Sequence, residues 1–145
     1  MEDFYVPPQG PPQGPPPDPA IWRALGEGGL TGLLQDFYLE LGRSPIAPLF
    51  PQGREALLAA GAQSALFFAG VVGGPPLYAQ RVGPPRMRAR HLPFAINAAA
   101  RAHWLACWEP VLAAASARHG FPPEHLAGFR AFLEDFSAWM VNKAG

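Results

Sequence analysis

The chain has 145 residues, of which 49% are hydrophobic, so it is long enough and apolar enough for one domain with a substantial core. Eleven basic residues balance eleven acidic ones, which argues against nucleic acid or an anionic membrane as the main partner. The single cysteine, Cys107, excludes an internal disulfide and favours a reducing, cytoplasmic location.

Residues 1–18 form a proline-rich tail in which the sequence Pro-Pro-Gln-Gly occurs twice. Consecutive prolines remove amide donors and the segment carries little apolar bulk, so we expect it to be extended or disordered. Because its start is acidic and lacks an apolar run, we expect no secretory signal. The tail either solubilises the domain or docks on a polyproline-binding partner. The folded domain is predicted to be residues 19–145.

The rest of the chain has helical periodicity and no strand pattern, which predicts an all-α fold with four main helices. A short helix is expected after Pro19, with an interruption at residues 26–29. The clearest stripe follows and ends at Gly42: it comprises Leu30, Leu33, Leu34, Phe37, Tyr38 and Leu41. Tyr38 needs a buried partner for its hydroxyl, and the pattern alone favours a core tyrosine bonded to a carbonyl.

A proline-rich corner at residues 44–53 turns Phe50 inward, and a helix is expected from about Arg54 to Val72. The stripe of this helix comprises Ala60, Ser64, Phe67, Phe68 and Val71. Ser64 is its polar exception and can bond back to the preceding turn. Residues 56–79 carry no charge, which raises the alternative of a membrane span. A Gly-Gly-Pro-Pro sequence breaks that run, so we expect a buried helix followed by a loop, and no membrane partner.

Two further helices complete the predicted core. One begins after Asn97, a good N-cap, and runs to about Gly120. It places Trp104 and Trp108 one turn apart on one face. Such a pair is usually part of a core, but it can also wall a large flat ligand. The last helix opens after two prolines, and its buried stripe comprises Leu126, Phe129, Leu133, Phe136 and Met140.

We place the function in the basic stretch from Arg86 to Phe94, where three arginines precede His91. Met87 lies four residues before His91 on the same face of a short predicted helix. A neutral imidazole in an apolar setting is a good ligand for iron, and neighbouring arginines suit the propionates of haem. Taken alone, the pattern favours a solvated basic turn, and neutral net charge disfavours a nucleic-acid patch.

A longer motif surrounds this stretch. GGPPLY at residues 73–78, RxG at 81–83 and PRxRxRHxPF at 85–94 together closely resemble the motif of group II truncated haemoglobins. The resemblance covers roughly residues 20–142, and it includes Phe37-Tyr38 and the tryptophan-leucine-cysteine run near Cys107. It implies a two-over-two helical sandwich around haem. No Cys-x-x-Cys-His sequence is present for covalent attachment, so haem b is expected.

The resemblance also implies roles for the matching residues. His91 would be the proximal ligand of the iron. Tyr38 and Trp104 would donate hydrogen bonds to a bound diatomic ligand, with Ala60 and Ser64 at two further distal positions. The other implied haem contacts are Phe50, Phe67, Phe68, Tyr78, Met87, Arg90, Phe94 and Ile96. Among them, Tyr78 and Arg90 match positions that bond the propionates.

Three functions follow from these interpretations. The first is a haem protein that reversibly binds dioxygen, carbon monoxide, nitric oxide or other small ligands, for example in oxygen transport. The second is a haem enzyme, a nitric oxide dioxygenase or a peroxidase, which uses the same site and a separate reductase. The third is a non-haem globin-like interaction module, which the joint presence of His91, Tyr38 and Trp104 disfavours. We expect a monomer or a homodimer.

Overall fold

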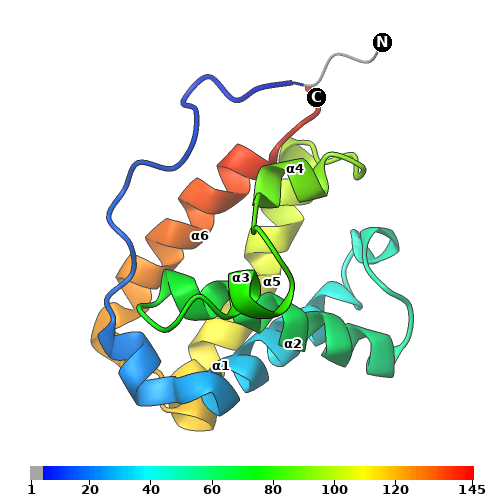
Figure 1. Cartoon of the computed structure of the whole chain (residues 1–145). Helices are drawn as coiled ribbons and strands as arrows, with labels where there is room; N and C mark the ends of the chain where they lie inside the picture. Colours follow the sequence, from blue (N-terminus) through cyan, green and yellow to red (C-terminus); the bar gives the residue numbers. More distant parts are fainter. Residues whose placement is uncertain (1–4) are drawn as a thin grey trace.

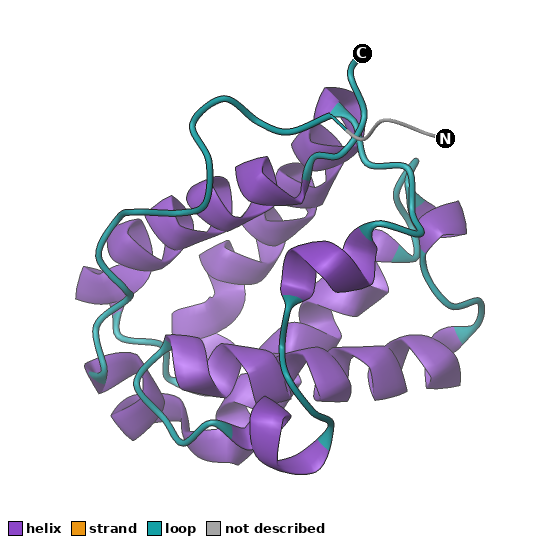
Figure 2. Ribbon diagram, turned by 45° about the horizontal axis from the view of Figure 1, so that its top comes forward, coloured by secondary structure: helices purple, strands orange, loops and turns teal. Residues whose placement is uncertain are grey.

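The computed structural model describes residues 5–145, and within that range it contains helices and loops but no strand (Figure 2). The prediction of an all-α fold is thus confirmed. The α-helices are α1 (Ala20–Leu41), α2 (Arg54–Val71), α3 (Leu77–Arg81), α4 (Met87–His91), α5 (Ala98–His119) and α6 (Leu126–Met140). Two short 3-10 helices, η1 (Ala47–Leu49) and η2 (Pro123–His125), precede α2 and α6.

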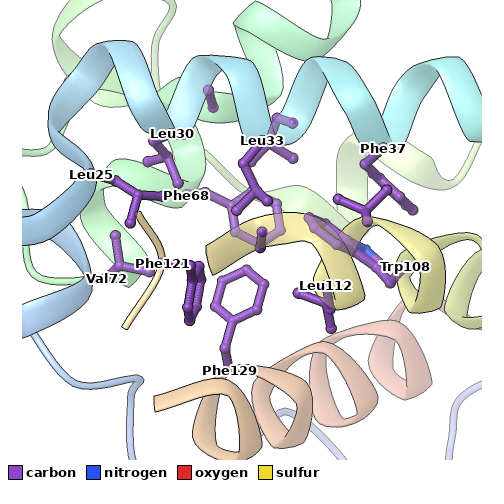
Figure 3. Packing of buried hydrophobic residues seen from close by; sticks show 14 of the residues in the cluster. Leu25, Leu30, Leu33, Phe37, Phe68, Val72, Trp108, Leu112, Phe121 and Phe129 are labelled. Atoms are coloured by element: carbon purple, nitrogen blue, oxygen red, sulfur yellow. The ribbon is translucent and has the colours of Figure 1, made fainter. Parts of the chain in front are cut away.

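The four long helices form two pairs, because α1 packs on α2 and α5 packs on α6 (Figure 1). The pairs meet where α1 also contacts α5. Aromatic rings from all four helices fill the space between them: Phe37, Phe68, Trp108 and Phe129 lie together in the core (Figure 3). The indole of Trp108 stacks on the ring of Phe37 with centroids 4.0 Å apart. This is the two-over-two sandwich that the sequence predicted.

The expected break after the first short helix is a single-residue kink rather than a four-residue interruption. Gly26 has φ 65° and ψ −173°, and helical backbone continues on both sides of it within α1. Only glycine adopts such a backbone without steric cost, because it has no Cβ. The first helical segment therefore changes direction at Gly26 and stays attached to the long one.

A second glycine sets the distance between α1 and α2. A Cβ added to Gly61 would lie 2.9 Å from the Cα of Gln35 and 3.0 Å from the carbonyl oxygen of Leu34. The two backbones are therefore in contact at this point. The side chain of Gln35 reinforces the contact, because its Nε2 donates to the carbonyl of Leu58 at 3.1 Å.

The segment between α2 and α5 holds two short helices where the sequence predicted one. The expected helix around His91 is α4, which begins at Met87 and ends just before Pro93. The residues from 73 to 85 were expected to form only a loop, but they contain α3, which buries Leu77 and Tyr78. The prediction missed α3 because the glycines and prolines around it hide a helix that is shorter than two turns.

The uncharged run at residues 56–79 is divided between α2, a turn and the start of α3. None of the helices in residues 5–145 is both long and apolar enough to cross a membrane. At the N-terminal end, residues 5–18 contain no helix or strand and run along α6 in an extended path (Figure 1). Residues 1–4 of the predicted tail lie outside the described residues.

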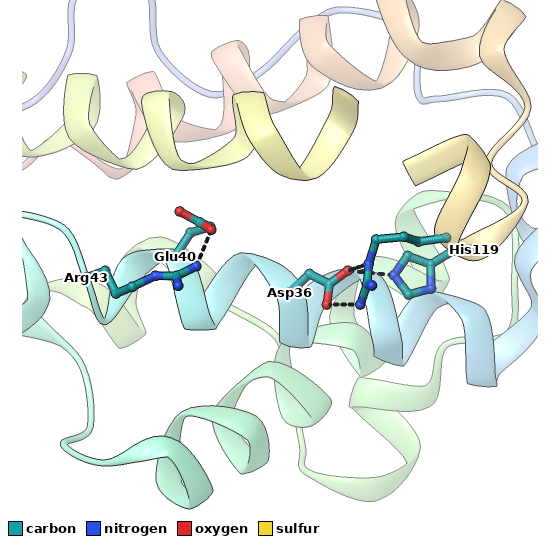
Figure 4. A network of polar contacts seen from close by, with 5 residues as sticks. Asp36, Glu40, Arg43 and His119 are labelled. Carbon is teal, nitrogen blue, oxygen red and sulfur yellow. Dashed lines mark hydrogen bonds and ion pairs between the residues drawn. The ribbon is translucent and has the colours of Figure 1, made fainter. Parts of the chain in front are cut away.

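An ion network ties the end of α5 to the middle of α1 (Figure 4). Both Asp36 carboxylate oxygens accept from the guanidinium of Arg118, at 2.8 and 2.9 Å. The Nε2 atom of His119 lies 2.7 Å from the same carboxylate. Burial acts to raise the pKa of Asp36, but the hydrogen bonds and charges of Arg118 and His119 outweigh it, so this pKa is lowered below its ordinary value.

We expect Asp36→Asn to lower the free energy of unfolding at neutral pH by about 1 kcal/mol. A carboxyl whose pKa is depressed in the folded state stabilises the protein above its unfolded pKa, and this contribution is lost as pH falls through the folded pKa. The difference in stability between parent and variant should therefore begin to shrink below about pH 4 and disappear only at a pH below the lowered pKa of the folded state. Urea unfolding at pH 7 and in acid measures this difference. Glu40→Gln, which breaks the exposed pair with Arg43, is the control and should have a smaller effect.

Candidate haem and ligand site

A cavity of about 420 Å³ lies between the two helix pairs and α4. Its volume is within the range of roughly 300–1,000 Å³ that is usual for sites of small molecules and cofactors. Residues from α1, α2, α3, α4, α5 and α6 line it, and most of them are aromatic or aliphatic. All thirteen site residues predicted from the sequence lie on its wall: His91, Tyr38, Trp104, Ala60, Ser64, Phe50, Phe67, Phe68, Tyr78, Met87, Arg90, Phe94 and Ile96.

The last turn of α4 presents His91 to the cavity. The Nδ1 atom of its imidazole lies 2.6 Å from the carbonyl oxygen of Met87, one turn earlier in the same helix. A carbonyl can only accept, so Nδ1 carries a hydrogen, and in the neutral imidazole Nε2 is then the nitrogen with the lone pair. Histidines that ligate metals are usually held in this way, because a bond to the second nitrogen fixes both tautomer and ring orientation. The arrangement fits an axial ligand to iron.

The described part of the chain contains no cluster of metal-ligating side chains. No three histidine, cysteine, aspartate or glutamate side chains gather there in a group that could hold an ion. A bare metal ion bound by protein alone would need such a group. Haem requires only one strong protein ligand, since the porphyrin supplies the others, and His91 on a large apolar cavity meets that requirement.

Tyr38 contributes a polar group to an otherwise aromatic wall. Its ring meets those of Phe37 and Phe50 edge-on, each with centroids 5.8 Å apart. Burial raises the pKa of the Tyr38 hydroxyl, and a hydrogen bond with the Ser64 side chain partly opposes this effect. The phenol therefore stays protonated at neutral pH and keeps a hydrogen to donate.

The two tryptophans of α5 have different surroundings. Trp104 lines the cavity and packs edge-on against Phe37 at 5.2 Å. Trp108 is only 1% exposed and belongs to the core behind Phe37. Helical spacing alone could not separate the two, because both lie on the same face of the helix one turn apart, whereas the family resemblance selected Trp104. Of the two indoles, that of Trp104 lies on the wall of the cavity.

Arg90 lies at the exposed rim of the cavity. Its Nε donates to the carbonyl of Pro85 at 3.0 Å and one terminal nitrogen donates to the carbonyl of Pro84 at 2.9 Å. The guanidinium carbon sits 5.2 Å from the centre of the Tyr78 ring, a cation–π contact. These contacts hold a positive charge at the mouth of the cavity. Phe94 stands at the same edge of the fold and is 45% exposed.

A second arginine, Arg101, also lines the cavity and was not predicted from the sequence. Its Nε donates to the Ser137 hydroxyl at 3.0 Å and a terminal nitrogen donates to the carbonyl of Glu134 at 2.9 Å. Helical spacing could have found it, since Arg101 lies one turn before Trp104 on the same face. The other unpredicted lining residues are Phe37, Ile46, Leu49, Pro51, Gln63, Ala100, Phe136, Ser137 and Met140. Most of the apolar ones were expected to be buried, but only as core.

Comparisons with known proteins identify the family of this chain. Residues 22–142 match the family model of the bacterial-like globins. The group 2 truncated hemoglobin YjbI of Bacillus subtilis is 35% identical over 94 residues, which are 64% of this chain and 69% of that protein. The crystal structure of phosphate-bound Hell's gate globin IV has a TM-score of 0.82 and 35% identity, and the match covers 92% of this chain and 81% of that one.

Two further solved structures have a TM-score of 0.71. They are the truncated oxygen-avid haemoglobin from Bacillus subtilis, with 32% identity over 84% of this chain and 98% of that one, and the group II truncated hemoglobin from Bacillus anthracis, with 30% identity over 92% and 96%. The family match spans most of the sequence, and the helices superimpose on those of these globins. The chain therefore belongs to the bacterial-like globin family as a group II truncated haemoglobin, a class of proteins that bind small ligands through haem.

Proposed function

We propose that the protein holds haem b through His91 and reversibly binds dioxygen and other diatomic ligands in the cavity. The observation that carries this proposal is the state of the His91 ring, whose Nδ1 is occupied by the Met87 carbonyl while the ring lines an apolar cavity. One relative, at 32% identity, is described as oxygen-avid, which supports dioxygen as the ligand.

Haem supplies an iron centre that binds diatomic gases reversibly. The chain supplies the environment of that ligand. Tyr38 and Trp104 bring an O–H and an N–H donor to the same cavity, whose wall is mostly aromatic or aliphatic. Fixed donors in a dry site stabilise a ligand that carries negative charge. Each such hydrogen bond is worth about 1.5–3 kcal/mol when the ligand is charged.

The position of the only cysteine supports noncovalent attachment of haem. The only cysteine, Cys107, is 8% exposed and lies in the hydrophobic core, and burial raises the pKa of its thiol. Haem would therefore be held by His91, by the apolar wall and by arginines at the mouth of the cavity. Purified protein should be red, and acidified organic solvent should extract the cofactor. A colourless protein that also fails to bind added haemin would contradict the proposal.

Arg90→Ala should speed haem loss several-fold without changing iron coordination. Its positive charge is fixed at the rim by the carbonyls of Pro84 and Pro85, where it suits a propionate. The measurement is transfer of haem to excess apomyoglobin, followed by absorbance. Arg81→Ala is the control, because Arg81 belongs to the same longer motif at residues 73–94 but pairs with Glu27 outside the cavity. Equal rates of haem loss from the parent and from Arg90→Ala would show that Arg90 only holds the loop at Pro84 and Pro85 and does not bind haem.

A further inference from the structure

A buried asparagine lies directly behind the segment that carries His91. Asn142 follows the end of α6 and is 0% exposed. Its Nδ2 donates to two carbonyl oxygens, that of His91 at 3.2 Å and that of Phe94 at 2.9 Å. Its Oδ1 accepts from the backbone N–H of Ile96 at 3.0 Å. Every hydrogen-bonding atom of this side chain is therefore used, and each bond goes to residues 91–96.

Residues 91–96 need such an external partner. They connect α4 to α5 through Pro93, which has no N–H, and they contain the proposed iron ligand. Besides the side-chain bonds, the backbone N–H of Asn142 donates to the carbonyl of Ile96 at 2.9 Å. The carbonyl of His91 also accepts from the backbone N–H of Phe94 at 3.0 Å. Removing the amide would therefore weaken the bonding of that carbonyl and leave the Phe94 carbonyl and the Ile96 N–H without partners, which is costly in a buried site.

Arg88 joins the same C-terminal segment to α4 from the other side. Its Nη1 donates to the carbonyl of Val141 at 2.9 Å and also bonds the carbonyl of Trp139, and the guanidinium lies 4.6 Å from the centre of the Trp139 ring. Its Nη2 donates to the carbonyl of Tyr5 in the N-terminal tail at 2.7 Å. Figure 1 shows the C-terminal segment beside α4. Residues 139–142 are thus bonded to α4 through Arg88, and to the segment that follows α4 through Asn142.

We infer that Asn142 is a positioning residue for the iron ligand, an inference that rests on the proposed role of His91. The plane of the His91 ring is set by its backbone and by the bond from Nδ1 to Met87. Asn142 fixes the carbonyl of His91 itself and the course of the chain up to Ile96. Groups of this kind, which touch no metal, commonly change metal affinity by about 10–100-fold when removed.

Two variants separate the hydrogen bonds from packing. Asn142→Asp keeps the shape and the acceptor for Ile96, but it replaces both N–H donors with an oxygen that repels the carbonyls of His91 and Phe94. Asn142→Ala removes all three bonds without adding charge. Ser116→Ala is the control, because it removes a comparable bond to the carbonyl of Phe121 at the far end of α5. If the Asn142 variants do not fold, Arg88→Met removes the hydrogen bonds between α4 and the C-terminal segment instead.

The main measurement is the iron–histidine stretching band in the resonance Raman spectrum of the reduced, ligand-free holoprotein. We expect the band to shift or broaden in both Asn142 variants and in Arg88→Met, with haem loss at least about tenfold faster, which corresponds to about 1.4 kcal/mol. In the apoprotein, hydrogen exchange should quicken in the peptide containing Ile96. Ser116→Ala should lower the unfolding temperature without moving the band.

An unchanged band in all three variants, with haem loss as slow as in Ser116→Ala, would overturn the inference and leave the proposed function intact. Then Asn142 would be only a structural residue at the chain end. A parent protein that binds haem but lacks any iron–histidine band would instead overturn the proposed role of His91, and the inference with it. The parent protein therefore tests the proposed role of His91, and the variants test the inferred role of Asn142.

Discussion

His91→Ala is expected to yield an almost colourless protein that retains little haem. The variant lacks the one cavity side chain whose ring nitrogen is free to bind iron while its other nitrogen is held by Met87. Bound haem also favours the folded state, by about 4 kcal/mol when the free ligand is at 1,000 times its dissociation constant. The variant should therefore unfold at a lower temperature than the parent, and added imidazole should restore part of the haem binding.

The other histidines supply the controls for this experiment. His103 is exposed on α5, His119 is bonded to Asp36, and His125 lies 3.8 Å from Asp18. None of the three lines the cavity. His103→Ala should keep the colour and the haem affinity of the parent. If His91→Ala kept a normal proximal-histidine spectrum, one of these three would be the ligand and the site would have to be placed elsewhere.

The second large effect concerns the two donors of the cavity. Tyr38→Phe removes a hydroxyl and keeps the ring, and Trp104→Phe removes the indole N–H. If each donor stabilises bound dioxygen, each change should speed dioxygen release at least about tenfold, since one decade corresponds to about 1.4 kcal/mol. Carbon monoxide carries less negative charge on its outer atom, so its release should change less. The double variant should not show the sum of the two effects, because both donors serve one ligand.

Stopped-flow dissociation of the two gases from the parent, the single variants and the double variant measures these effects. Trp108→Phe is the matched control, because it makes the same substitution in the core behind Phe37 and outside the cavity. It should lower stability and leave dioxygen release within about twofold of the parent. Small and equal changes for both gases in Tyr38→Phe and Trp104→Phe would show that these residues only pack the wall.

Much of the fold was predictable because its helices carry regular stripes. The spacing of apolar residues from Leu30 to Leu41 predicts the long part of α1, and Asn97 caps α5 as expected, with its side chain accepting from Ala100. A stripe of apolar residues indicates which side chains are buried, however, and does not indicate whether they pack in the core or line a cavity. Phe136 therefore appeared as core, although it also lines the cavity.

The features that escaped prediction depend on contacts between distant parts of the chain. Asn142 lies 51 residues from His91 in the sequence, and no local pattern connects them. The bond between Arg101 and Ser137 spans 36 residues. The cavity itself could be assembled from sequence only through the resemblance to a family, since that alone relates α4 to α1 and α5. The roles of the thirteen predicted lining residues stay predictions until ligand binding is measured.

The contact at Gly61 also bears on how such a site can vary. The spacing of α1 and α2 is set there by backbone against backbone, so it does not depend on the side chains that line the cavity. Ala60 and Ser64, which flank Gly61 on α2 and line the cavity, can then change size or polarity without moving the helix that bears them. The same scaffold can therefore be retuned from one gas or affinity to another by exchanging a few small residues, provided that the glycine is kept.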